Sequence, residues 1–287
     1  FSVGIYLMSN LTDLISAGGG GTLFTIPVTK STTWTPPFDG TAVIHCIGAG
    51  ASGGVAKVSN AYPVASGGAG GYSRKVVTLS TGTNWTMVVG AGGASHVDTS
   101  GTSGGASGGN TTATDGSSSL TANGGNASAA GGTASGGDVN NTGGAGATGN
   151  YILSGGAVGV LGTGNAGAGQ NKVNVGSSTR QSFGGHSDVM SPQFENTNGE
   201  LRGGGAGGRN GARFSSTPSN SESNMNGGFL AGGGGFWSGG DNVSMVGGDG
   251  GIGGGGGSCA YPNGSGSPPA SGAGGHGLII VMYTAIG

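Results

Sequence analysis

Hydrophobic and β-branched residues gather in five segments close to the two ends of the chain, where they alternate with polar residues or run continuously. Such segments, rich in Val, Ile and Thr, predict the strands of a small β-sandwich. Because the last segment stands at the carboxyl end, we expect a sandwich base over residues 22–100 that residues 272–287 complete. Trp34, in the turn-rich stretch STTWTPPFDG, is expected to cover one end of its core. The five segments are TLFTIPVT (22–29), GTAVIHCIGAG (40–50), YSRKVVTLS (72–80), NWTMVVGAGG (84–93) and GLIIVMYTA (277–285).

The first 21 residues follow a different pattern and hold the one helix that the sequence predicts. Ser9 or Asn10 can cap it, LTDLIS supplies apolar spacing, and Gly18 can end it. A helix of two turns is marginal in water, so its apolar side chains need to pack against this domain or a neighbouring chain. We interpret residues 1–21 as a segment that attaches the domain to a larger assembly. The apolar side chains are Phe1, Ile5, Tyr6, Leu7, Leu11 and Leu14.

The interior, residues 101–271, consists of glycine doublets separated by small residues at a spacing near three or its multiples. A left-handed polyproline-II-type helix has three residues per turn and a rise of about 3.1 Å. With glycine on the faces turned to neighbours, such helices can exchange backbone hydrogen bonds. The pattern predicts a polyglycine-II helix bundle with residues 253–257, GGGGG, as a central helix surrounded on all sides. The expected fold class is mostly β and irregular, with almost no α-helix.

Composition raises two alternatives to this bundle. Glycine accounts for 75 of 287 residues, more than three times its ordinary share of roughly 7%. The absence of a strict G-x-y register excludes a collagen triple helix. Disorder is the second alternative, because Gly/Ser-rich chains usually behave as flexible linkers. Strands at both ends of the interior argue against disorder, since a long structureless loop is uncommon inside a compact domain.

Net charge and sequence motifs argue against several classes of function. Charged residues make up 7% of the chain and the formal net charge is −2, which argues against binding to nucleic acid or to an anionic membrane. Gly48, Gly50 and Gly53 form a Gly-x-Gly-x-x-Gly motif after an apolar strand, as in dinucleotide-binding folds. The residues that follow cannot build the required crossover helix, and no acidic residue stands about 20 positions further on. We therefore expect no cofactor.

The spacing of the titratable side chains predicts neither a metal site nor a catalytic site. The histidines lack metal-ligand spacing, and His45 and His276 are interpreted as structural. Asp249, within a glycine run, is assigned to capping or to the surface rather than to calcium. Three carboxylates lie in a polar loop without an apolar cleft to separate their pKa values, so we expect no enzymatic activity. These side chains are His45, His96, His186, His276, Asp188, Glu195, Glu200 and Asp249.

Two cysteines, Cys46 and Cys259, stand far apart in the sequence. A disulfide between them is one interpretation, and two separate buried thiols are the favoured one.

Aromatic and apolar residues in the segments that interrupt the glycine runs are the candidate binding residues. Rigid aromatic anchors beside adaptable Asn, Ser and Pro are typical of a protein-binding surface. The competing interpretation is that such residues cover the edges of the bundle, and we favour it for Phe229, Phe236 and Trp237. The candidate receptor-binding residues are Tyr62, Tyr151, Ile152, Met190, Phe194, Phe214, Met225 and Tyr261.

Three stretches carry a family resemblance: WTPPFDGTAVIHCIGAGASGG, GGAGGYSRKVVTLSTGTNWTMVVGAGG and GAGGHGLIIVMYT, within residues 34–93 and 272–284. They resemble the glycine-rich domain of bacteriophage tail-fibre and receptor-binding proteins. The alternation of glycine runs and loops is similar to the tip adhesins of T-even-like phage long tail fibres. That resemblance implies a polyglycine-II bundle whose distal loops bind a host outer-membrane protein.

The sequence thus predicts a non-enzymatic receptor-binding adhesin at the tip of a phage tail fibre, extracellular, with a bacterial outer-membrane protein or surface glycan as ligand. Residues 1–21 are expected to contact other tail-fibre or virion subunits, and a homotrimer is left open. The alternative function is a structural virion or extracellular filament or decoration protein without a receptor role. An ice-binding protein is a third candidate, and the irregular charged loops argue against it.

Overall fold

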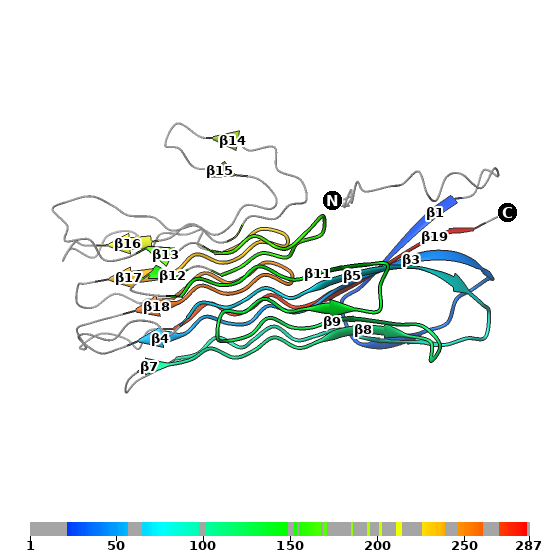
Figure 1. Ribbon diagram of the computed structural model, residues 1–287, viewed down its shortest axis with the longest axis horizontal. Coiled ribbons are helices and arrows are strands. Elements are labelled where there is room, and N and C mark those ends of the chain that lie inside the picture. Colours follow the sequence, from blue (N-terminus) through cyan, green and yellow to red (C-terminus); the bar gives the residue numbers. More distant parts are fainter. Residues whose placement is uncertain are drawn as a thin grey trace.

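A computed structural model of the chain describes part of its residues, and the account of structure is confined to them. The described ranges are 22–56, 65–97, 102–148, 152–153, 155–167, 169–170, 185, 194–195, 201–202, 211–213, 226–238, 246–260 and 270–285. The protein is elongated (Figure 1), with a sandwich of two sheets at one end, glycine-rich segments running lengthwise, and a further small sheet at the other end. The fold is mostly β, as predicted, and no described residue lies in an α-helix or a 3-10 helix.

Two five-stranded sheets form the sandwich. All five predicted strand segments lie in them as β1, β3, β5, β6 and β19, so this prediction is confirmed. Sheet I has the order β1 (Thr22–Val28), β19 (Leu278–Ala285), β3 (Gly40–Ile47), β5 (Tyr72–Leu79) and β11 (Val139–Asn141). Sheet II has the order β10 (Ala134–Ser135), β9 (Ser119–Ala122), β8 (Thr111–Thr114), β6 (Trp85–Val88) and β2 (Thr32–Trp34).

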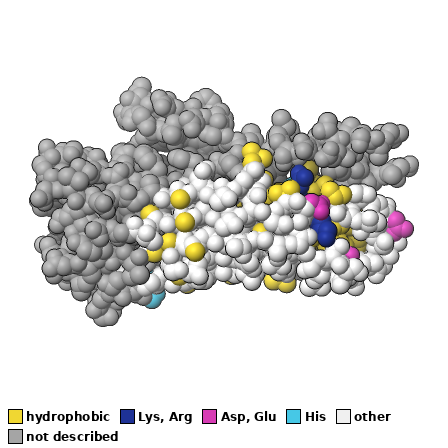
Figure 2. All heavy atoms as spheres, viewed as in Figure 1, with side chains coloured by type: hydrophobic (Ala, Val, Ile, Leu, Met, Phe, Trp, Pro, Cys, Tyr) yellow, Lys and Arg dark blue, Asp and Glu magenta, His cyan; other side chains and the backbone are white. Residues whose placement is uncertain are grey.

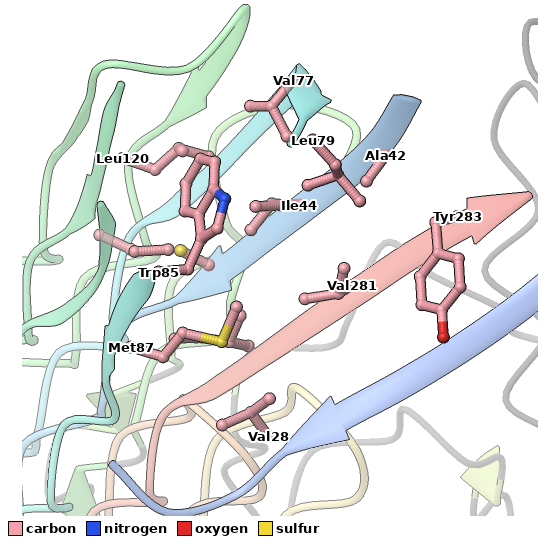
Figure 3. Packing of buried hydrophobic residues seen from close by; sticks show 14 residues of the cluster. Val28, Ala42, Ile44, Val77, Leu79, Trp85, Met87, Leu120, Val281 and Tyr283 are labelled. Carbon is pink, nitrogen blue, oxygen red and sulfur yellow. The ribbon is translucent and has the colours of Figure 1, made fainter. Parts of the chain in front are cut away.

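The core of the sandwich lies between these sheets (Figure 3). Ile44 and Leu79 of sheet I face Trp85 and Leu120 of sheet II, and all four side chains are fully buried. Tyr283 closes one end of this core. The centroids of the Tyr283 and Trp34 rings are 6.2 Å apart. The predicted position of Trp34 at the end of the core is thereby confirmed.

Four strands, β8 to β11, come from residues 111–141, in the stretch that the sequence analysis placed in the bundle. β8 and β9 form an antiparallel hairpin closed by Asp115, whose Oδ1 accepts hydrogen bonds from the N–H groups of Ser117 and Ser118. The hairpin has a recognisable sequence signal, since Thr-rich segments flank an Asp-Gly turn. Sheet II therefore consists of this interior segment together with β2 and β6 from the first hundred residues.

The glycine-rich segments are helices with three residues per turn, as their backbone hydrogen bonds show. Along residues 48–54, donors at every third position bond the same neighbouring segment, and the acceptor numbers fall by three at each step. A rotation of one third of a turn per residue produces this pattern, and the falling numbers make each neighbour antiparallel. The donor and acceptor pairs are Gly48 and Gly71, Ala49 and Gly109, Gly50 and Gly275, Ala51 and Gly68, Ser52 and Ala106, Gly53 and Gly272, and Gly54 and Ala65.

Residues 254–257 form the central helix of the bundle, as predicted for residues 253–257, whereas Gly253, with a φ of 69°, lies in the turn before it. All five glycines are buried, and their backbone bonds reach six other segments. Because the neighbours surround this helix, its N–H and C=O groups find partners without any side chain. Gly255, Gly256 and Gly257 donate to Gly156, Ala51 and Gly248, and they accept from Gly233, Gly67 and Gly272.

Strands of the sandwich continue directly into helices of the bundle. β3 runs into residues 48–54, residues 65–71 lead into β5, and residues 270–277 lead into β19. The same segments that pair in sheet I remain hydrogen-bonded to one another in the bundle. Sandwich and bundle are therefore joined by continuous hydrogen-bonded backbone (Figure 1).

A third five-stranded sheet, here called the distal sheet, lies at the end of the bundle away from the sandwich (Figure 1). Two short antiparallel pairs complete the described strands. The distal sheet has the order β16 (Gly211–Arg213), β17 (Phe236–Ser238), β18 (Cys259–Ala260), β4 (Val55–Ala56) and β7 (Thr102–Ser103). The pairs are β12 (Ile152–Leu153) with β13 (Gly169–Gln170), and β14 (Phe194–Glu195) with β15 (Leu201–Arg202).

A second apolar core lies on the outer face of sheet I, where the bundle ends. Ile47, Tyr72 and Ile280 of the sheet contact Val158 and Leu230 from returns of the glycine segments. Phe229 packs against this cluster, which confirms its predicted role as cover. The sandwich thus has buried apolar residues on both faces of sheet I.

His45 contacts Tyr72 of this second core and is structural, as predicted. Its side chain is buried, and its Nδ1 lies 2.8 Å from the hydroxyl of Tyr72. Burial, with a smaller contribution from the charge of Arg74, lowers the pKa of His45 from 6.5 to about 4. The imidazole is therefore neutral in the folded protein at neutral pH.

This buried histidine predicts a loss of stability in mild acid. The unfolded chain binds a proton near pH 6.5 and the folded chain only near pH 4, so His45 lowers the free energy of unfolding as the pH falls between these values. At pH 4.5 the expected loss relative to pH 7 is about 2 to 3 kcal/mol. Urea unfolding at both pH values tests it, with His45→Gln as the control that lacks this slope. An identical pH dependence in both proteins would contradict the prediction.

Cys46 and Cys259 are separate free thiols, which confirms the favoured interpretation. Cys46 lies in the sandwich core and Cys259 in β18. Burial raises the pKa of each thiol to about 12. Both are therefore protonated and unreactive at neutral pH.

Candidate functional site: the distal end of the bundle

Four short strands of the distal sheet run side by side in the same direction. β16 pairs in parallel with β17, β17 with β18, and β18 with β4, whereas β7 is antiparallel to β4. β4 follows the helix that starts at β3, so the common direction leads away from the sandwich. The carboxyl ends of all four strands therefore lie at one edge of the sheet, at Arg213, Ser238, Ala260 and Ala56.

The sequence that follows each of these strand ends belongs to the feature-rich segments that interrupt the glycine runs. They are residues 57–64, 214–225, 239–245 and 261–269. Four predicted binding residues, Tyr62, Phe214, Met225 and Tyr261, fall within them. The strand order thus brings the starting points of these segments together, although they are distant in sequence.

Of the predicted binding residues, the structure describes only Ile152 and Phe194. Ile152 lies in β12, which lies against β17 and β18 at the distal end. Phe194 lies in β14 of its own two-stranded sheet. For both, the description covers the backbone alone. The others lie outside the described ranges and stay predictions: Tyr62, Tyr151, Met190, Phe214, Met225 and Tyr261.

The glycine-rich segments of the bundle, which carry the distal sheet, are held together by close packing of backbone against backbone. A Cβ added at Gly50 would overlap the carbonyl oxygen of Gly254, so this approach requires glycine. At the edge of the bundle, side chains satisfy the outer donors: Asp249 Oδ1 accepts from the N–H of Ala273 at 2.7 Å. His276 lies two residues before β19 begins, and its Nδ1 accepts a hydrogen bond of 3.2 Å from the N–H of Gly92. Both residues thus have the structural roles expected of them.

The Gly-x-Gly-x-x-Gly motif is part of this support. The N–H groups of Gly48, Gly50 and Gly53 donate to carbonyl groups of Gly71, Gly275 and Gly272. Donors used in this way are not free to bind a pyrophosphate, which is what the motif does in dinucleotide-binding folds.

The bundle carries few charges on the face shown in Figure 2. The Lys, Arg, Asp and Glu side chains seen there lie over the sandwich, and the bundle surface is formed by backbone, small polar and apolar groups. Within the described ranges, no three His, Cys, Asp or Glu side chains are placed to hold a metal ion. The same ranges contain no helix with the length and apolar character to cross a membrane.

Comparison with known proteins gives one family match, which covers most of the chain. The model of a family described as a glycine-rich domain matches residues 27–284. The chain belongs to this family. The match begins in β1 and ends in β19, so the glycine-rich domain includes the sandwich strands as well as the bundle. None of the curated proteins matches the chain.

The distal sheet was missed by the sequence analysis of this glycine-rich domain. Its strands are two or three residues long and lie within glycine runs, so neither alternation nor length marks them. Phe236 and Trp237, interpreted as cover, form β17 in the middle of the parallel strands. The one available signal was the recurrence of a glycine run followed by a few larger residues, as in GGGGGSCA and GGGGFWS.

Proposed function

We propose that this glycine-rich domain is the receptor-binding adhesin of a phage tail fibre, and that it attaches without catalysis to a protein or glycan of the bacterial surface. The observation that carries the proposal is the set of four parallel strand ends, from which four feature-rich segments start at one edge of a rigid bundle. Binding residues on loops above a rigid scaffold are a common arrangement for recognition. The sequence resemblance to tail-fibre and receptor-binding proteins supports the same assignment.

A rigid support favours binding, because the conformational entropy that a flexible surface loses when it becomes ordered opposes association. Each flexible side chain immobilised at an interface costs about 0.5 to 1.5 kcal/mol. A hydrogen-bonded bundle holds the strand ends in place before binding, so the loops alone need to adapt. Several copies on one virion would add avidity when more than one engages the same cell.

Cell binding tests the proposal directly. The purified, fluorescently labelled chain is incubated with a panel of Gram-negative strains and bound protein is measured by flow cytometry. Replacement of residues 214–225 or 261–269 by Gly-Ser segments of equal length is expected to reduce binding at least about tenfold with an unchanged melting temperature. A matched control, Val88→Ser with Leu161→Ser, removes exposed apolar side chains away from the distal sheet and should bind as the original does.

Pretreatment of the cells identifies the ligand class. Loss of binding after protease treatment indicates a protein receptor, and loss after periodate oxidation indicates a glycan. If no strain binds the original chain, or if both replacements bind as well as it does, the adhesin proposal is wrong. Tolerance of both replacements, with loss of assembly after removal of residues 1–21, would favour the structural filament protein.

A further inference from the structure

β1 is the edge strand of sheet I, and its outer edge has no partner among the described strands. Within that part of the chain it pairs with β19 alone. The strand, TLFTIPV, carries no charged residue, although charges on an edge strand are a common protection against pairing with another chain. An uncharged, apolar strand at the edge of a sheet is a template for the addition of a further strand.

Two adjacent large apolar side chains of β1 are exposed to solvent. Leu23 is 39% exposed and Phe24 is 41% exposed. They point to opposite faces of the sheet, because successive residues of a strand alternate. Phe24 stacks on Tyr283 of β19, with ring centroids 5.3 Å apart, so its packed side is the one toward β19. A strand added at the free edge would cover both exposed side chains.

Pro27 indicates which backbone groups of β1 point to the free edge. It stands opposite Ile280 in the antiparallel ladder with β19. Proline has no N–H and occurs in edge strands with its nitrogen toward solvent. The backbone groups of Pro27 therefore point away from β19. Because this orientation alternates along an antiparallel strand, the N–H and C=O groups of Leu23 and Thr25 also point to the free edge.

We propose that two copies of the chain associate through β1, antiparallel and with Phe24 opposite Phe24, so that sheet I continues from one copy into the other. In this register Leu23 of each copy stands opposite Thr25 of the other copy. Each Leu23–Thr25 pair then exchanges both of its N–H···O bonds. None of these bonds needs the N–H group that Pro27 lacks.

A second copy fits this edge because the segment is complementary to itself. At the centre, the two Phe24 rings stand side by side and extend the stack on Tyr283 into a row of aromatic rings across the interface. A register that pairs Leu23 with Pro27 would leave the C=O group of Leu23 without a donor. Pro27 therefore favours the register centred on Phe24. A contact between two identical edges has two-fold symmetry and closes as a dimer.

Pairing at β1 leaves the distal sheet free. β1 belongs to the sandwich, and the distal sheet lies at the other end of the protein (Figure 1). A dimer therefore carries two distal sheets, and its avidity exceeds the affinity of one copy when both engage the same cell. This consequence rests on the proposed function, whereas the pairing itself does not.

Sedimentation velocity of the full chain over a range of concentrations tests the pairing. The original chain should form a dimer. Thr25→Pro removes an N–H group that points to the free edge and none that bonds β19, so it should raise the dimer dissociation constant at least about tenfold. The matched control is Thr25→Val, which keeps this N–H group and should dimerise as the original chain does.

A side-chain variant tests the same edge without changing its backbone. Leu23→Lys places a charge on the edge strand and should also raise the dissociation constant at least about tenfold. The matched control is Val88→Lys, since Val88 is likewise an exposed strand residue, 41% exposed, but lies in sheet II. The melting temperature of each variant shows whether it is folded.

Disulfide crosslinking tests the register. In the proposed pairing the Cα atoms of the two Phe24 residues are about 4.5 Å apart, which is within the range that a disulfide spans. Phe24→Cys should therefore give a disulfide-linked dimer on oxidation, while Cys46 and Cys259 stay buried. Leu161→Cys, at a residue 67% exposed and outside sheet I, should not.

Three results would overturn the proposal. The first is a monomer at every concentration, which would mean that the edge is unpaired or is covered by the same chain. The second is a trimer, and the third is a dimer that Thr25→Pro and Leu23→Lys leave as stable as their controls do. All three are independent of receptor binding, so the pairing and the proposed function can fail separately.

Discussion

Gly255→Ala is expected to lower the free energy of unfolding by at least about 3 kcal/mol, or to prevent folding. The added Cβ would overlap the carbonyl oxygen of Gly67, and backbone on all sides leaves no room for it to move. Overpacking of this kind costs about 1 to 3 kcal/mol. Displacement also breaks the bonds of Gly255 with Gly156 and Gly233, and each buried group left unpaired costs about 1 to 3 kcal/mol more.

One effect of this substitution acts in the opposite direction. Alanine reduces the conformational freedom of the unfolded chain and thereby favours folding by about 0.4 to 1 kcal/mol. At Gly255 this gain is smaller than the losses. At Gly104, where a Cβ would meet nothing within 4 Å, the gain should remain.

Gly104→Ala is therefore the matched control, expected within about 1 kcal/mol of the original protein and on the stabilising side. Urea unfolding monitored by circular dichroism measures both variants. If Gly255→Ala lost less than about 1 kcal/mol, the close backbone packing at the centre of the bundle would be refuted.

Trp85→Ala should lower the free energy of unfolding by about 3 to 5 kcal/mol, the range for truncating a large buried aromatic side chain. Trp85 is fully buried between the two sheets, against side chains of both. Trp34, its partner in the register of β2 and β6, is only partly buried. Trp34→Ala should therefore cost less, about 1 to 2 kcal/mol.

A second substitution, Trp85→Phe, separates the effect of lost side-chain volume from the effect of the indole N–H. The indole N–H of Trp85 is buried without a hydrogen-bond partner, which itself costs free energy. Trp85→Phe removes that donor and leaves a smaller cavity than alanine does, so its expected loss is about 1 to 2 kcal/mol. Equal losses for Trp34→Ala and Trp85→Ala would contradict the assignment of Trp85 to the centre of the core.

The strands of the sandwich base could be predicted because their signal is local. β3, β5 and β19 combine β-branched residues with clear boundaries, and each is eight residues long. The position of residues 253–257 at the centre was also predictable, since five consecutive glycines accept neighbours on every side. The candidate binding residues stay predictions, because those side chains lie outside the structural description.

The sequence by itself determined the five long strands of the sandwich and the helices with three residues per turn, because these depend on short-range periodicity and on the absence of a Cβ. Tertiary structure alone decided which of them meet. The hairpin of β8 and β9 completes sheet II, sheet I gains a second core around His45, and four parallel strands share one edge of the distal sheet. The physical reason is that backbone hydrogen bonds between glycine segments carry no side-chain pattern, so nothing along the chain specifies the partner of each segment.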